Sequence, residues 1–136
     1  MSRLSTAVAC ASLVFLVGAC GSSSSPTATP TAAPNVTDTF NGTLAQGGSA
    51  SYNFTLASDG TITVTLVSLS PQSTITMGMG LGTPGTTGCV VASTQENVKV
   101  GVPLQTTLSA GPYCLTFYDL GNMIGANAYT LTILHP

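Results

Sequence analysis

The fold follows most directly from residues 111–122, which read Gly-Pro-Tyr-Cys-Leu-Thr-Phe-Tyr-Asp-Leu-Gly-Asn. A Gly-Pro turn opens this stretch, apolar and small or polar side chains then alternate, and a second turn closes it. Alternation with a period of two is typical of a strand that buries one face. We therefore predict a core strand here, with the thiol of Cys114 inside it.

The same alternation recurs along the chain from residue 39. It is clearest in Ser49–Leu56 and Thr61–Val67, and Ser-Asp-Gly at 58–60 predicts a hairpin turn between these two strands. Gly78 and Gly80 predict a bulge or a close backbone approach within another strand. The remaining strands are predicted at 39–44, 74–81, 89–92, 97–102, 104–108 and 129–134, with a loop at 82–88.

Eight or nine short strands without a helical segment predict an all-β domain. The expected architecture is an antiparallel, jelly-roll-like β-sandwich, and about 100 residues suffice for one modest core. Apolar residues make up 43% of the 136 residues, and they recur in short alternating runs that disordered chains lack.

Charged residues make up only 4% of the chain, against about 25% in typical globular proteins. Lys99 is the only lysine or arginine after Arg3. A nucleic-acid partner is therefore excluded, because binding to phosphates needs a basic patch that releases counterions.

Residues 1–19 have the features of a secretory leader: Arg3, a mostly apolar run, and small residues at the end. The tetrad Val-Gly-Ala-Cys at 17–20 resembles the bacterial lipobox. The resemblance implies a lipoprotein signal peptide that is cut before Cys20, and acyl chains such as palmitate on that cysteine. Ordinary signal-peptidase cleavage is the alternative, because the small residues also suit it.

Two or more acyl chains anchor a protein stably to a membrane. The expected location is therefore the bacterial cell envelope, in the outer membrane where the organism has one, with the domain outside the cytoplasm. Residues 20–35 combine the lipidated cysteine with a Ser/Thr/Pro-rich tether that has no hydrophobic periodicity, and we expect this segment to be disordered. The folded domain is expected to span residues 36–136.

The chain contains four cysteines, and only two of them are expected to remain free for pairing. Cys10 leaves with the leader and Cys20 takes the lipid, so Cys89 and Cys114 are left in an oxidising compartment. We predict a structural disulfide between them. The alternative is a redox-active pair, which usually has the spacing Cys-x-x-Cys.

The ionisable residues do not form a pattern that predicts catalysis, and we expect no enzyme. His135 is the only histidine and is expected to be frayed at the chain end, where no catalytic triad would hold it. Asp59 and Asp119 stand beside glycines, so turn formation is their expected role. Met77 and Met79 are expected to fill the core, and we expect neither a metal nor a cofactor.

Five segments occur in the order found in the bacterial pre-peptidase C-terminal domain, which residues 36–136 resemble. These segments are Phe40–Leu44, Gly48–Phe54, Gly60–Leu66, Ala110–Asp119 and Tyr129–Ile133. The resemblance implies a jelly-roll module, and some members of this family resemble collagen- or polysaccharide-binding modules. Calcium sites of some family members are not carried over, because the acidic residues here are few and scattered.

The sequence thus predicts a non-catalytic, lipid-anchored module of the cell envelope. It is expected to bind polysaccharide or protein weakly at the cell surface. The alternative is a structural or accessory lipoprotein subunit of an envelope or secretion-associated complex. Tyr113, Tyr118, Asp119 and Asn122 are the candidate ligand-binding residues, because tyrosine stacks on sugars or peptides and loop 120–128 follows this strand.

Overall fold

The computed structural model describes residues 33–136, and the leader, Cys20 and most of the predicted tether lie outside them. Within the described range no helix is long and apolar enough to cross a membrane. Eight strands follow one another: β1 (Val36–Leu44), β2 (Ser49–Leu56), β3 (Gly60–Ser70), β4 (Met77–Gly85), β5 (Gly88–Val98), β6 (Pro103–Leu108), β7 (Gly111–Tyr118) and β8 (Asn127–His135).

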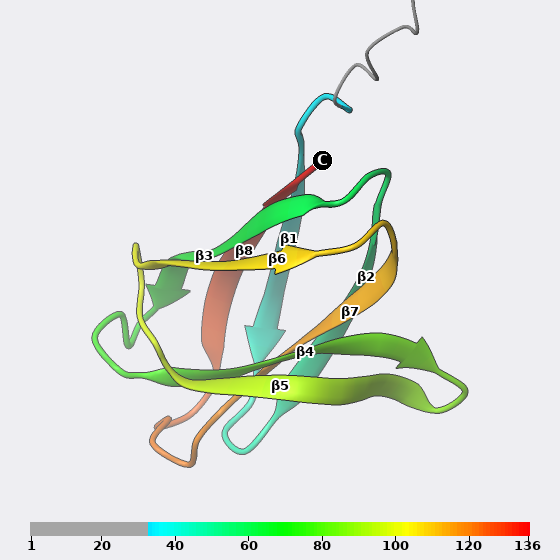
Figure 1. The fold of residues 1–136 in the computed structure, drawn as a ribbon. Helices are drawn as coiled ribbons and strands as arrows, with labels where there is room; N and C mark the ends of the chain where they lie inside the picture. Colours follow the sequence, from blue (N-terminus) through cyan, green and yellow to red (C-terminus); the bar gives the residue numbers. More distant parts are fainter. Residues whose placement is uncertain (1–32) are drawn as a thin grey trace, which may run out of the picture. The chain divides into compact units, whose positions relative to one another are not determined.

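The strands form two antiparallel four-stranded sheets that face each other (Figure 1). One sheet has the order β1-β8-β3-β6 and the other has the order β2-β7-β4-β5. Successive strands alternate between the sheets except for β4 and β5, which form a hairpin within one sheet, and this order is that of a jelly roll. The predicted fold class is therefore confirmed, and the strand order adds the topology to it.

The core lies between the sheets and is formed by the alternating apolar positions of the sequence. Ile62 and Leu66 of β3, Leu131 and Ile133 of β8, and Phe117 of β7 are fully or almost fully buried. Burial of each such side chain contributes roughly 1.5–3 kcal/mol to folding. The outward positions of these strands are mostly threonine and serine, which hydrate the surface in place of charges.

The predicted hairpin between residues 49–56 and 61–67 is wrong, although both strands exist. β2 pairs with β7, whereas β3 pairs with β6 and β8 in the other sheet. The Asp59 carboxylate accepts a hydrogen bond from the backbone N–H of Ala110, at 2.7 Å. The turn residues reverse the chain as expected, but the reversal carries the chain across the sandwich instead of along one sheet.

The region 82–102 also differs from the prediction. Residues 89–92 and 97–102 were expected as two strands, but one strand, β5, runs from Gly88 to Val98. Residues 99–102 form a turn in which the Val102 N–H donates to the Lys99 carbonyl. The predicted loop at 82–88 is instead the end of the β4–β5 hairpin.

Gly78 and Gly80 of β4 were predicted to mark a bulge or a close approach: the Tyr118 ring lies close over Gly78, whereas the bulges lie in the partner strand β5. The register shifts between Met77 and Met79, and again between Leu81 and Gly82. In both places β5 contains one more residue than β4. A β-bulge bends its strand and turns side chains in new directions, so β5 departs from a regular edge strand.

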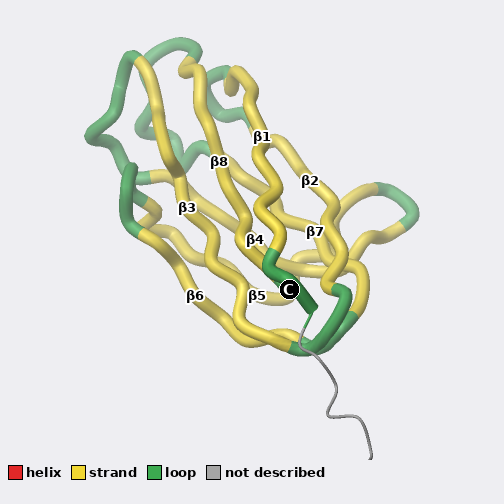
Figure 2. The backbone as a smooth tube through the Cα atoms, turned by 90° about the horizontal axis from the view of Figure 1, so that it is seen from above, coloured by secondary structure: helices red, strands yellow, loops and turns green. Residues whose placement is uncertain are grey.

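The two lateral sides of the sandwich are closed differently. On one side Phe40 of β1 stacks on Tyr52 of β2, with ring centroids 4.3 Å apart. On the other side β5 and β6 are the edge strands of their sheets and face each other across the space between the two sheets (Figures 1 and 2). Small polar side chains replace the aromatic pair there, and this difference leaves room for a groove.

Candidate functional site: a groove between two edge strands

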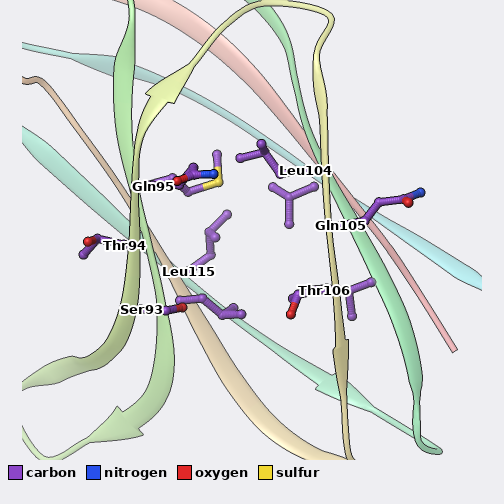
Figure 3. Close-up of a pocket in the computed structure, with 11 residues that line it drawn as sticks. Ser93, Thr94, Gln95, Leu104, Gln105, Thr106 and Leu115 are labelled. Atoms are coloured by element: carbon purple, nitrogen blue, oxygen red, sulfur yellow. The ribbon is translucent and has the colours of Figure 1, made fainter.

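A groove of about 190 Å³ lies between β5 and β6. Its floor is formed by core side chains from both sheets, including Ile62 and Val64 of β3, Met79 of β4 and Leu115 of β7. Leu104 of β6 also points into the space (Figure 3). The floor is therefore aliphatic, and it is continuous with the core of the domain.

The rim of the groove is polar but carries no charge. Ser93 and Gln95 of β5 point into it from one side, and Thr106 of β6 lies on the other (Figure 3). No residue that lines the groove is acidic, basic or aromatic. An aliphatic floor with a few polar groups at the rim is typical of binding sites, although this groove is smaller than the roughly 300–1,000 Å³ of small-molecule pockets.

The predicted disulfide is confirmed, and it defines the end of β5 that lies away from the groove. Cys89 and Cys114 are bonded, with their Cα atoms 5.6 Å apart. β4 lies between β5 and β7 in the sheet, so β5 must fold over β4 to bring the two cysteines together. Gly82 permits this crossing, because a side chain there would overlap the backbone of Val90.

The candidate ligand-binding tyrosines lie on opposite faces of β7 and are not brought together. Tyr113 packs inward against Phe54, and its hydroxyl donates to the Ser109 carbonyl at 3.0 Å. Tyr118 faces outward, and its ring covers Gly78, where a side chain would overlap it. Five residues of strand separate the two tyrosines by about 17 Å. Both rings pack against other parts of the chain.

Asp119 organises the loop that follows β7. One carboxylate oxygen accepts hydrogen bonds from the N–H groups of Gly121, Asn122 and Met123, and the other accepts from Gly47 at 2.8 Å. Burial acts to raise the pKa of Asp119, but the four N–H donors together hold the pKa below its ordinary value. The carboxylate of Asp119 therefore stabilises the backbone conformation of this loop.

Asn122 and its neighbours tie the same loop to the segment before β4. The Asn122 amide donates to the Thr76 carbonyl at 2.9 Å. Gln72 accepts hydrogen bonds from the N–H of Ile124 and from the side chain of buried Asn127. The loop therefore holds the Ile124 side chain, which is 81% exposed, on a fixed backbone. Asp119 and Asn122 lie together here, whereas Tyr113 lies at the other end of β7.

His135 is buried, and the expectation that it is frayed is wrong. Its Nε2 lies 3.1 Å from the Asp38 carboxylate and its Nδ1 lies 3.3 Å from the Pro136 carbonyl. The carbonyl of Pro136 in turn accepts a hydrogen bond from the Ala57 N–H, which fixes the chain end against β2. Both ring nitrogens are thus engaged by the chain itself.

The groove was not predicted from the sequence. Ser93, Gln95 and Thr106 have no feature that separates them from other polar strand residues, and the floor residues read simply as core. One signal was present: the alternation fails between residues 92 and 97, where β5 is bulged. Bulges are common at sheet edges and next to functional sites. In residues 33–136 no three His, Cys, Asp or Glu side chains gather as a metal site would require.

No protein-family model and no curated protein matches the sequence. The resemblance to the pre-peptidase C-terminal domain therefore stays a prediction. Among solved structures, the chain matches Aeromonas hydrophila PliG, a periplasmic inhibitor of g-type lysozyme, with a TM-score of 0.49. The sequences are 13% identical, and the match covers 73% of this chain and 84% of that one. A likeness at this level carries no argument about partner or ligand.

Proposed function

We propose that this protein is a non-catalytic binding module of the bacterial cell envelope, held on a membrane by lipid at Cys20. In this proposal its partner is a protein, and the contact surface is the groove between β5 and β6. The observation that carries the proposal is the groove itself, which opens between the two edge strands and has an aliphatic floor that is continuous with the core. Covering apolar groups of this kind with a partner removes them from water and lowers the free energy of the complex.

The lining of the groove favours a protein over a polysaccharide. Sugar rings are commonly held by stacking on aromatic side chains, and no tyrosine, phenylalanine or tryptophan lines this groove. Protein partners, in contrast, insert aliphatic and aromatic side chains into apolar clefts.

The location proposed for the module is supported by two features. The lipobox-like tetrad ending at Cys20 supports the anchor. The Cys89–Cys114 disulfide supports a site outside the cytoplasm, because disulfides persist in oxidising compartments.

The absence of catalysis is part of the same proposal. The groove has no titratable residue in its lining, so it offers neither a nucleophile with a base nor a pair of carboxylates. His135, the only histidine of the chain, has both ring nitrogens engaged within the fold.

A pull-down from native membranes tests this proposal with a matched pair of variants. Thr106→Lys places a charge at the groove, whereas Thr107→Lys places the same charge on the outer face of β6, where Thr107 meets Thr61. The wild type and Thr107→Lys should retain one stoichiometric protein partner, and Thr106→Lys should lose it. Equal retention by both variants would contradict the groove as the contact surface.

A glycan array completes this test. We expect no signal above background from the wild-type protein. A glycan signal that Thr106→Lys abolishes would place a polysaccharide in the groove and would overturn the choice of a protein partner.

A further inference from the structure

The outer edge of β6 is the most regular unpaired strand edge next to the groove. β6 pairs with β3 from Pro103 to Leu108 without a register shift, and it stands at the end of its sheet. In an antiparallel pair, alternate residues direct their N–H and C=O groups away from the partner strand. β6 therefore presents a row of backbone donors and acceptors to any strand that lies beside it.

β5, on the other side of the groove, is a poor template for the same kind of pairing. It contains one extra residue between Gln95 and Val98, and another at Ala92. Such bulges interrupt the ladder of donors and acceptors and twist an edge away from further strands. The groove thus has one edge suited to strand addition, β6, and one irregular wall, β5.

The size of the groove limits what a strand added to β6 could insert. Every second side chain of such a strand would point toward the facing sheet, which contributes Met79 and Leu115 to the floor. About 190 Å³ is below the roughly 300–1,000 Å³ of small-molecule pockets, so the groove suits a small aliphatic side chain better than a larger group. It is small for a cofactor or a drug-sized ligand.

The chemistry of the rim limits the charge of the occupant. Ser93, Gln95 and Thr106 offer hydroxyl and amide groups but no counterion. Moving a charged side chain from water into a cleft without an opposite charge costs free energy. The occupant is therefore uncharged where it meets the groove, and polar groups flanking its aliphatic side chain can bond to the rim.

We propose that the groove takes an extended, uncharged segment of the partner protein. This segment adds as a strand to the free edge of β6 and places an aliphatic side chain on the apolar floor. The inference rests on the proposed function and adds the mode of recognition and the chemistry of the partner. Backbone hydrogen bonds would supply much of the affinity in this mode, and the cleft would select the side chain.

The opposite side of the sandwich serves as an internal comparison. β1 and β2 are also edge strands, but the stacked rings of Phe40 and Tyr52 lie between the two sheets there. An added strand on β1 could pair its backbone but would find no open apolar floor for its side chains. The proposal therefore assigns the partner segment to β6 and predicts no protection of the β1 edge.

Amide hydrogen exchange tests strand addition directly. The probe is a peptide with capped ends, Gly-Ser-Thr-Leu-Thr-Val-Thr-Ser-Gly, added to the full lipidated protein in detergent. A matched peptide carries Lys in place of Leu and Val. The uncharged peptide should slow exchange by about tenfold or more at alternate amides of β6 within residues 104–108, since Pro103 has no N–H, and leave β1 unchanged. The lysine peptide should have no effect.

Two variants confirm that the protection comes from the groove. Thr106→Lys should weaken binding of the uncharged peptide by about tenfold or more, because it brings a charge to the apolar cleft. Thr107→Lys, on the outer face, should bind the peptide as the wild type does. Loss of binding in both variants alike would contradict a role for the groove.

Several other results would overturn the inference. The peptide could bind without slowing exchange in β6, or the lysine peptide could protect β6 equally well. Protection of β1, or no protection of any strand, would contradict the inference as well. Protection of β6 that grows with protein concentration without peptide would assign the edge to a second copy of this chain. If the partner pull-down still depends on Thr106 in any of these cases, the proposed function stands and only the strand-addition mode fails.

Discussion

At residue 82 the backbone of β5 lies so close to β4 that no side chain fits between them. A Cβ on Gly82 would overlap the Val90 carbonyl, and Gly82 pairs with Cys114 on its other side. Gly80 lies in the same strand, but a Cβ there would meet only the side chain of Val91, at 2.9 Å. Val91 is 41% exposed and can rotate away.

We therefore expect Gly82→Ala to lower the free energy of unfolding by about 1–3 kcal/mol, the usual cost of overpacking. Gly80→Ala is the matched control and should cost clearly less. Urea denaturation of both variants measures the difference. Equal losses in the two variants would show that the crossing of β5 over β4 does not depend on Gly82.

Asp119 is a second single residue whose effect can be measured, because its carboxyl group makes the stability of the fold depend on pH. The pKa of its carboxyl is lower in the folded protein than its ordinary value of about 3.9. A group with a lowered folded pKa adds stability that is fully present above the unfolded pKa and is lost as pH falls through the folded one. Stability should therefore decline below about pH 4 in the wild type.

Asp119→Asn removes this titration, so the variant should lose less stability than the wild type over the same pH range. Denaturant titrations at pH values from about 6 down to 2.5 measure the two slopes. Parallel curves for the two proteins would mean that the four N–H donors around Asp119 do not favour its charged form.

Among the elements, β5 depends on a covalent bond as well as on pairing. The Cys89–Cys114 disulfide closes a loop with a sequence separation of 25, which corresponds to about 3.5 kcal/mol in the chain-entropy model. The double variant Cys89→Ser, Cys114→Ser should lose stability of that order in a denaturant titration. Mass mapping under non-reducing conditions should find the two residues joined in exported protein, and free thiols there would contradict the assignment.

Strands with clear alternation were predictable from sequence, and their partners were not. Residues 49–56 and 61–67 became strands as expected, because their apolar positions repeat every second residue. The Ser-Asp-Gly turn between them indicates only that the chain reverses there. Whether the next strand joins the same sheet depends on contacts with β6, β7 and β8, which are distant in sequence.

β5 shows why the site was harder to predict than the fold. Two bulges and a run of exposed polar residues break its alternation, so its sequence reads as two short strands. The groove arises because Ser93, Gln95 and Thr106 are too small or too polar to close the gap that Phe40 and Tyr52 close elsewhere. A difference of this kind becomes visible only when the facing strands are known.

For the whole molecule, the proposal joins a lipid anchor to a binding domain. Cys20→Ser removes the thiol that would carry the lipid, so the variant should appear in the soluble fraction of broken cells. Wild-type protein should stay in the membrane pellet, because two or more acyl chains bind a bilayer stably. A high-salt wash of both pellets separates lipid anchoring from ionic adsorption. A variant that remains in the washed pellet would contradict the anchor.

The central claim is that the groove between β5 and β6 holds a partner protein. Site-specific photo-crosslinking in living cells tests it most directly, with the photoreactive residue at Thr106 beside the groove or at exposed Thr39 of β1, at the opposite edge of the sheet. The account predicts one discrete crosslinked product from position 106 and none from position 39. Products of equal yield from both positions, or a product from position 39 alone, would contradict it.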